Sequence, residues 1–472
     1  MKKMAKVLAL SLSSMLIASS LVACGGGSGN STSGNEDTPI DVKVNLDPMI
    51  AAELEIMVPG GNSNEQTMID CLIDDFALLY PNVEISMSYI SVNNYVSNVR
   101  NQALAGTLPD ILWSNTPDFY DVVSEGAILN LTPYLKASEE AETLNTYLNE
   151  AGEPMKFSFE NDFYTEFFDM TSMGEKCYVI PRSCDSIVTF YNKDIFTKAG
   201  VDMTKVKNGW TWDEFMDVCA AIRTWMDNNG HRNDYVVDAN LTSWLSVCYP
   251  MLVAHGSEVI SEDGKNIIDC PETQACVELV REMVEKRYII DSKNATSTSF
   301  ETGNSAMLFQ SASISLYANK PSLKGKIDLV SFPLIMDNNT PKIGAGAAGY
   351  SICSTSKNKD VAWAFLSYLL SQKGQQKMAL NGLNLASIRK DLSDHTKANW
   401  GKNYETLNLS AYTYGAEYKI ATEFFTRTKL TAKAAIQQSL VQLFTDATNA
   451  SKPIADAISS AKRGIDYALI DY

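Results

Sequence analysis

The chain has 472 residues, of which 45% are hydrophobic and 20% charged, a composition typical of globular proteins and unlike that of disordered or collagen-like chains. Its length allows two or three lobes, each with its own core. The formal net charge of −17 indicates a surface that repels phosphate backbones, so nucleic acid is not an expected partner.

Residues 1–23 have the pattern of an export signal, which is not part of the mature fold. Three lysines precede an apolar stretch from Val7 to Val22, and Leu21-Val22-Ala23-Cys24 follows at its end. This tetrapeptide resembles the lipobox of bacterial lipoproteins, in which cleavage before the cysteine leaves a thiol for diacylglycerol attachment. We therefore expect a lipid on Cys24 and a flexible tether over residues 24–50. The alternative is a simple secretory peptide that happens to end near a cysteine.

Helices and strands are then expected to alternate through the first third of the chain. A capping box at Ser63-Asn64-Glu65-Gln66 predicts a helix that ends near Leu79. Residues 83–89 alternate between apolar and polar, which predicts a half-covered strand. A helix before Gly106, a buried strand at 111–113 and a helix at 116–126 complete this part.

The same alternation continues in the middle of the chain and beyond it. Thr211 and Glu214 form a second capping box in front of an apolar helical stripe. Strands are expected at 187–191, 327–332 and 350–353, with a glycine loop at 344–349 and a helix at 359–370. Alternating elements predict an α/β fold with parallel strands, and ligand-binding loops at the ends of those strands.

Metal and cofactor chemistry is not expected. Besides Cys24 the chain has eight cysteines, none in a CxxC pair, and its three histidines lie far apart. Most of these cysteines fall in apolar patterns, which favours free thiols, although an even count in an exported chain also permits disulfides. After the export signal no apolar run reaches the roughly 20 residues that span a bilayer.

Several motifs, in their order along the chain, resemble those of the family 1 extracellular solute-binding proteins. They include Pro109-Asp110-Ile111-Leu112-Trp113, the stretch from Gly126 to Leu135, Tyr191-Asn192-Lys193-Asp194-Ile195-Phe196, and Trp210-Thr211-Trp212-Asp213-Glu214-Phe215. The resemblance covers most of residues 54–390. After Ala306-Met307 the family often has a tryptophan that touches ligand, but this chain has Gln310-Ser311-Ala312-Ser313 there.

The resemblance implies a periplasmic-binding-protein-like type II fold, with two discontinuous α/β lobes, a hinge and an interlobe cleft. Lobe 1 is expected from residues 51–167 plus 327–375, and lobe 2 from residues 168–326 plus 376–472, with crossings near 165–170, 326 and 376. The implied function is that of a substrate-binding lipoprotein of an ABC importer, not of an enzyme. A monomer, lipid-anchored on the outer face of the cell membrane, would capture a mono- or oligosaccharide by lobe closure and deliver it to a permease.

The candidate ligand-binding residues combine flat aromatic rings with planar polar groups, because a sugar offers apolar C–H faces and a ring of hydroxyls. Asp185 matches an acidic position that often binds ligand in the family, and Arg182 lies beside it. The full set is Asn62, Trp113, Asn115, Arg182, Asp185, Trp244, Gly346 and Gly349. For Trp113 and Trp244 the alternative is core packing, and for the two asparagines it is an ordinary turn.

The glycine loop at 344–349 also satisfies the GxGxxG pattern, but a dinucleotide site needs a helix directly after it, and here a strand is expected. The loop is therefore interpreted as backbone that passes close to the ligand. A secreted glycoside hydrolase lipoprotein is the competing enzymatic hypothesis, although no motif presents its pair of carboxylates. Two further hypotheses are a receptor for a non-sugar polar solute and a surface adhesin.

Overall fold

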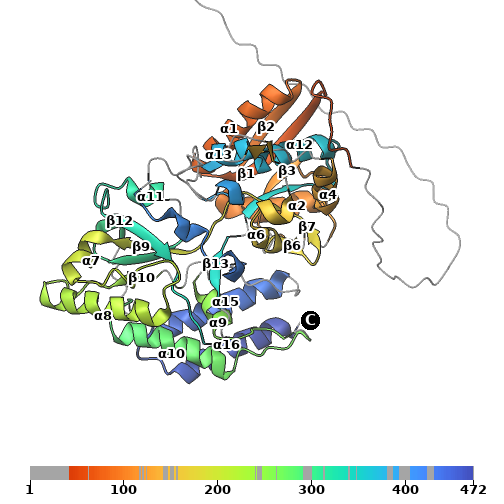
Figure 1. Ribbon diagram of the computed structural model, residues 1–472. Helices are drawn as coiled ribbons and strands as arrows, with labels where there is room; N and C mark the ends of the chain where they lie inside the picture. The colour runs from red at the N-terminus through yellow and green to blue at the C-terminus, as the bar shows by residue number, and fades with distance from the viewer. Residues whose placement is uncertain are drawn as a thin grey trace, which may run out of the picture. The chain divides into compact units, whose positions relative to one another are not determined.

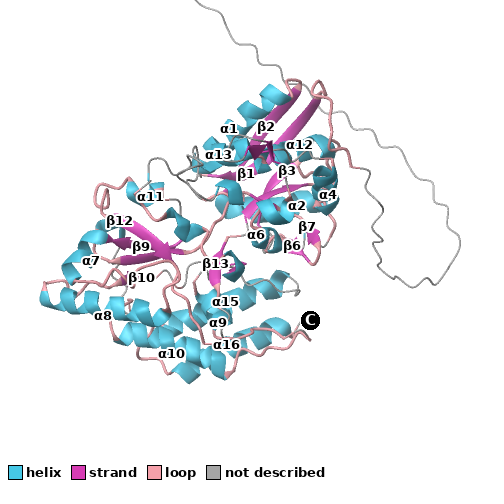
Figure 2. Cartoon of the chain, in the orientation of Figure 1, coloured by secondary structure: helices cyan, strands magenta, loops and turns pink. Residues whose placement is uncertain are grey.

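The computed structural model is shown in Figures 1 and 2. It describes residues 42–61, 63–115, 119, 122–123, 125–141, 147–148, 154–155, 158–239, 241, 247–261, 263–290, 300–311, 314–337, 341–346, 348–379, 386–392, 404, 406–421 and 430–470. The expected export signal, Cys24 and most of the expected tether fall outside these ranges. None of the helices within them is long and apolar enough to cross a membrane.

One of the two main sheets has five strands in the order β2-β1-β3-β14-β8. Its strands are β1 (Ala52–Gly60), β2 (Val83–Ser91), β3 (Ile111–Asn115), β8 (Ile180–Pro181) and β14 (Ala348–Ile352). β1 is parallel to β2 and β3, whereas β14 is antiparallel to β3 and β8. Helices α1 (Ser63–Leu79), α2 (Tyr95–Ala105), α4 (Thr132–Glu140), α12 (Lys359–Leu370) and α13 (Gln372–Met378) lie around this sheet (Figure 1).

The other main sheet has four strands in the order β10-β11-β9-β12. These are β9 (Val188–Asn192), β10 (Val237–Asp238), β11 (Met307–Gln310) and β12 (Ile327–Ser331), and β9 is antiparallel to both β11 and β12. The helices of this part are α7 (Lys193–Ala199), α8 (Trp212–Asn228), α9 (Cys248–Ala254), α10 (Pro271–Glu285), α15 (Leu430–Ala447) and α16 (Ile454–Leu469). Figure 2 shows these helices in cyan and the sheet in magenta.

The remaining elements are short strands and helices outside the two main sheets. Small two-stranded sheets pair β4 (Tyr147–Leu148) with β5 (Pro154–Met155), β6 (Ser172–Met173) with β7 (Lys176–Cys177), and β13 (Ile343–Ala345) with β15 (Lys419–Ala421). The short helices are η1 (Val92–Asn94), α5 (Phe159–Asp162), α6 (Thr165–Asp169), η3 (Phe300–Thr302), α11 (Ser315–Ala318), η5 (Lys390–Leu392), η7 (Leu409–Tyr412) and η8 (Ala416–Tyr418).

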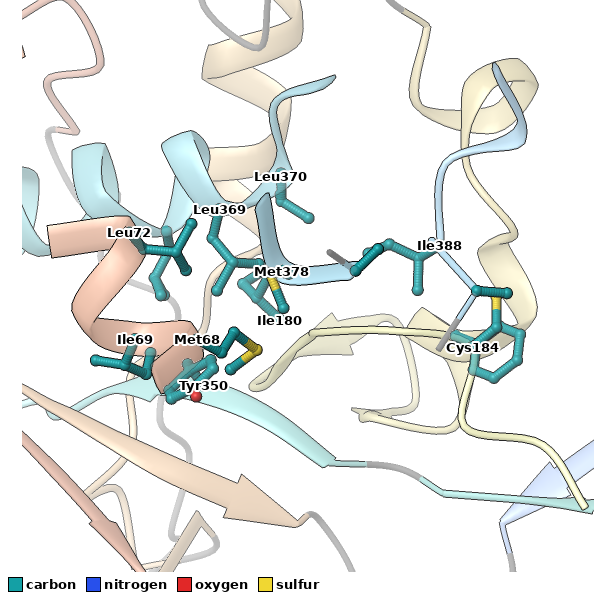
Figure 3. Close-up of a cluster of buried hydrophobic side chains, with 14 of the residues drawn as sticks. Met68, Ile69, Leu72, Ile180, Cys184, Tyr350, Leu369, Leu370, Met378 and Ile388 are labelled. Carbon is teal, nitrogen blue, oxygen red and sulfur yellow. The ribbon is translucent and has the colours of Figure 1, made fainter. Parts of the chain in front are cut away.

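A continuous apolar core fixes α1 on the five-stranded sheet. Figure 3 shows Met68, Ile69 and Leu72 of α1 close to Leu369, Met378 and Ile180, with Tyr350 of β14 below Met68. All of these side chains are at most 3% exposed, so the position of the first turn of α1 is set by close packing as well as by its polar contacts.

Local sequence signals predict most element boundaries correctly. The box at Thr211 is present: its hydroxyl accepts from the Glu214 N–H at 3.2 Å, and the Glu214 carboxylate accepts from the Thr211 N–H at 2.8 Å. Helix α12 has the predicted bounds. The expectation of parallel strands holds for β1 with its two neighbours and for β10 with β11. It is wrong for the pairs that β9 forms with β11 and β12 and for the pairs that β14 forms with β3 and β8. β14 enters its sheet from another part of the chain and not through a βαβ crossover.

The lobe boundaries differ from the expected ones at two places. Residues 327–331, assigned to lobe 1, form β12 in the four-stranded sheet with β9, and residues 180–181, assigned to lobe 2, form β8 beside β14. The chain therefore passes between the sheets after Pro181 and again after Ser331, later than expected. The physical reason is strand pairing: β8 and β12 are held by backbone partners that local sequence patterns do not reveal.

All eight cysteines after residue 42 are free thiols, in agreement with the expectation from their apolar surroundings. Six of them are buried, and Cys71 and Cys270 are partly exposed.

Candidate functional site

Four chain segments meet where the polypeptide passes between the two sheets, and we call this region the junction. It comprises residues 182–187, 343–346, 386–388 and 419–421. Cys184 donates its N–H to the carbonyl of Ala386 at 2.8 Å, and Ile187 donates to Gly344 at 2.8 Å. The third connection is the parallel pair of β13 with β15. Because the four segments are far apart in sequence, the junction exists only in the folded chain.

A buried ion pair ties the junction to the first turn of α1. Arg182 follows β8, and its Nη1 lies 3.1 Å from Oε2 of Glu65, a side chain that is 3% exposed. The Tyr350 hydroxyl, from β14, also hydrogen-bonds Glu65. Burial lowers the pKa of Arg182, but the charges of Glu65 and Asp185 more than offset this effect and raise it. The guanidinium is therefore charged and points towards Glu65.

Asp185 lies three residues along the same segment, and its side chain is partly buried. Burial raises the pKa of this carboxyl group, while Arg182 and a hydrogen bond with Ser311 lower it in part. Among the described residues, Oδ1 of Asp185 and Nε of Arg182 are both buried without a hydrogen-bond partner. Buried polar atoms without a partner are uncommon in folded proteins, so they indicate where a bound molecule or a water would sit.

The two glycines predicted to contact ligand have different surroundings. The Gly346 N–H donates to the carbonyl of Asp185 at 2.5 Å, and a Cβ at this position would stand 2.6 Å from Oδ2 of Asp185. Gly349 faces β8 instead, where a Cβ would stand 1.9 Å from the carbonyl oxygen of Ile180. Gly346 therefore makes room for the Asp185 carboxylate, whereas Gly349 allows β14 to approach β8.

Trp113 is the middle residue of β3, which runs two residues beyond the expected end at position 113, and its side chain is half-buried. One contact is an edge-to-face arrangement with Tyr95, whose ring centroid is 5.8 Å away at an interplanar angle of 77°. The Tyr95 hydroxyl donates to the Trp113 carbonyl at 2.8 Å. Trp113 thus combines core packing with a partly exposed ring. Asn115 ends β3 and pairs with Ala348 through its backbone.

Arg182, Asp185 and Gly346 are brought together at the junction, whereas Asn62 and Trp244 lie outside the described residues. Sequence reasoning did not assign a role to Glu65 beyond its capping box, nor to Ser311 as a partner of Asp185. Ser311 stands in the stretch where the resemblance leads one to expect a tryptophan, and this departure was the only available signal. Lys419 was also missed, since no motif surrounds it.

A small cavity behind Arg182 has about the size of one water molecule and is lined by Ser183, Gln375 and Ser387 among others. Within the described ranges no group of three or more His, Cys, Asp or Glu side chains is arranged to hold a metal ion. At the junction, Asp185 offers a carboxylate, Arg182 a guanidinium and Ser311 a hydroxyl group for hydrogen bonding.

Two sheets of mixed strand direction, each with helices around it and joined by several crossing segments, define a periplasmic-binding-protein-like type II fold. A family model described as "Bacterial extracellular solute-binding protein" matches residues 72–407. The chain belongs to this family, which confirms the expectation from its sequence motifs.

Related proteins are also binding proteins. A putative binding protein of Brucella abortus is 21% identical over 311 residues, which cover 64% of this chain and 68% of that protein. An arabinooligosaccharide-binding protein of Halalkalibacterium halodurans is 22% identical over 224 residues, 45% of this chain and 47% of that protein. The crystal structure of a cyclic alpha-maltosyl-1,6-maltose binding protein from Arthrobacter globiformis has a TM-score of 0.68 at 16% identity, covering 90% of this chain and all of that one.

Proposed function

We propose that this protein captures a carbohydrate outside the cell and delivers it to the permease of an ABC importer. The observation that carries the proposal is the pair of unsatisfied polar atoms at the junction, Oδ1 of Asp185 and Nε of Arg182. A sugar hydroxyl can donate to a carboxylate oxygen such as the first and accept from an N–H such as the second. The partly exposed ring of Trp113 provides an apolar face for stacking.

The relatives support a sugar rather than another polar solute. An arabinooligosaccharide is named for one of them and a cyclic maltosyl-maltose for another. Sugars of this size present several rings, which would favour an extended site between the two sheets. Micromolar affinity corresponds to roughly 8 kcal/mol, which a few stacked rings and several hydrogen bonds can supply.

The proposed mechanism is lobe closure. A solute that contacts both lobes favours the closed arrangement by the extra affinity it has for that arrangement. The closed protein would then dock on the permease, which reopens the lobes and accepts the solute. The protein would act as a monomer and would not alter the sugar chemically.

A thermal-shift screen tests the carbohydrate proposal. Arabino- and malto-oligosaccharides and their monosaccharides are added to the purified protein, and a ligand should raise Tm further as its concentration increases. The Asp185→Ala variant should need at least tenfold more ligand to reach the same rise in Tm. Stabilisation by a non-sugar solute alone would contradict the carbohydrate assignment, and the appearance of shortened oligosaccharides would contradict a role confined to binding.

We further propose that the mature chain is held on the outer face of the membrane by a lipid on Cys24. The lipobox-like Leu21-Val22-Ala23-Cys24 supports this anchor. In the producing cell, labelled palmitate should enter the wild-type protein but not a Cys24→Ala variant, and only the wild type should sediment with membranes. Equal labelling of both proteins would place any lipid elsewhere.

A further inference from the structure

Lys419 is a buried lysine at the centre of the junction. It begins β15, which is parallel to β13, and only 6% of its surface is exposed. Its Nζ lies 2.5 Å from Oγ of Ser186, on the segment that crosses from β8 to β9. One side chain thus links two of the four junction segments.

The surroundings of Lys419 are poor in groups that stabilise a positive charge. A charged ammonium has three N–H donors, and among the described residues the Ser186 hydroxyl is the one hydrogen-bond partner of this side chain. The ion pairs formed by the described residues do not include Lys419. Burying a charged ammonium with few partners is costly, whereas a neutral amine carries no charge and has one donor fewer, so its burial costs less.

The titratable groups near Lys419 compensate little of this cost. Burial lowers the pKa of Lys419 to about 7, although Cys184 on the crossing segment and Glu417 of η8 act in the opposite direction. Burial also raises the pKa of the Cys184 thiol, which keeps that thiol neutral. The Lys419 charge lowers the pKa of Cys184, whereas the charges of Glu166 and Asp185 raise it further. The amine therefore titrates near physiological pH, far below the range of an exposed lysine.

We propose that Lys419 makes the junction sensitive to pH: the neutral amine fits between the crossing segments as observed, and uptake of a proton loosens them. Loosening follows because the charged amine needs water or a new partner, and either requires the segments around Ser186 to separate. Since every movement of one sheet relative to the other must bend these segments, the proton would act directly on the part of the chain that has to flex. This inference does not depend on the identity of the solute.

Urea unfolding of the full chain without any solute tests the proposal. Between about pH 7 and pH 10 the unfolded chain holds one proton more than the folded chain at this position, so the folded state should gain stability as the pH rises. The unfolding equilibrium constant should fall by up to about tenfold per pH unit in this range, and the effect should level off below about pH 7.

Variants separate Lys419 from other titrating groups. Lys419→Met, which never carries charge, should lose this pH dependence, and Lys419→Gln serves the same purpose if the methionine variant does not fold. Lys205→Met is the matched control, because Lys205 is exposed and pairs with Asp217, and it should keep the wild-type dependence.

Hydrogen exchange locates the effect. After correction for the pH dependence of chemical exchange, protection of the Ile187 and Gly346 amides should fall towards pH 7 in the wild type and stay constant in Lys419→Met. Parallel pH curves for the wild type and both Lys419 variants, in unfolding or in exchange at these amides, would overturn the proposal.

Discussion

The tight contact between Gly346 and Asp185 offers a direct test of the candidate site. An alanine Cβ at position 346 would stand 2.6 Å from Oδ2, 3.0 Å from Cγ and 3.2 Å from Cβ of Asp185. To reach an ordinary contact of 3.4 Å, the carboxylate must withdraw by roughly 0.8 Å, which is enough to break a well-aligned hydrogen bond. The steric effect falls on the carboxylate that we propose binds solute.

The expected magnitude follows from the value of one charge-assisted hydrogen bond, about 1.5–3 kcal/mol. Gly346→Ala should therefore weaken solute binding by roughly 10- to 150-fold, measured by isothermal titration with the best sugar from the thermal-shift screen. Asp185→Ala should cost a similar amount, since it removes the same carboxylate.

The double variant decides whether the two effects have one cause. If Gly346→Ala acts by displacing Asp185, then the substitution should cost almost nothing in an Asp185→Ala background, and the cycle should show a coupling of about 1.5–3 kcal/mol. Urea unfolding of all four proteins controls for changes in stability. Additive losses, or unchanged affinity in Gly346→Ala, would refute the assignment of Asp185 as a ligand contact made possible by Gly346.

Three other substitutions test separate parts of the reasoning. Arg182→Met should destabilise the fold by about 3–5 kcal/mol in urea unfolding, because it leaves the buried Glu65 carboxylate without its cation. Combining it with Glu65→Gln should restore most of the lost stability. A double variant as unstable as Arg182→Met would contradict this reasoning. Gly349→Ala should lower stability by about 1–3 kcal/mol or more, since its Cβ meets the Ile180 carbonyl at 1.9 Å, and wild-type stability would refute the packing role. Trp244→Ala should weaken solute binding at least tenfold, about 1.4 kcal/mol, without unfolding the protein, and unchanged affinity in titration would remove Trp244 from the site.

Element boundaries were predictable wherever the chain carries a local signal. The capping box at Thr211 places the start of α8, and the apolar run of residues 361–370 places α12. β14 shows the limit of such signals: residues 348 and 349 look like part of a glycine loop, yet Gly349 belongs to the strand because only a residue without a Cβ fits against β8. Strand direction and lobe boundary depend on pairing between distant segments, which local patterns do not encode.

In the candidate site too, residues within one local motif could be predicted, whereas their partners from distant parts of the chain could not. Arg182 and Asp185 could be proposed because they follow a short apolar strand within a recognisable motif. Glu65, Ser311 and Lys419 become their neighbours only through the tertiary fold, from positions more than a hundred residues away in sequence. The sequence therefore predicts the segment that carries the site, but not the distant residues that pair with it or hydrogen-bond to it.

The free cysteines have a practical consequence. Thiol reagents attack the thiolate, and burial raises the pKa of Cys177, Cys184 and Cys353 while their side chains are shielded from solvent. A single cysteine engineered at an exposed position of each sheet would therefore react with a fluorophore much faster than these native thiols. Once the partly exposed Cys71 and Cys270 are replaced by serine, energy transfer between two such dyes could follow the approach of the sheets in real time, in a protein that keeps its six buried cysteines.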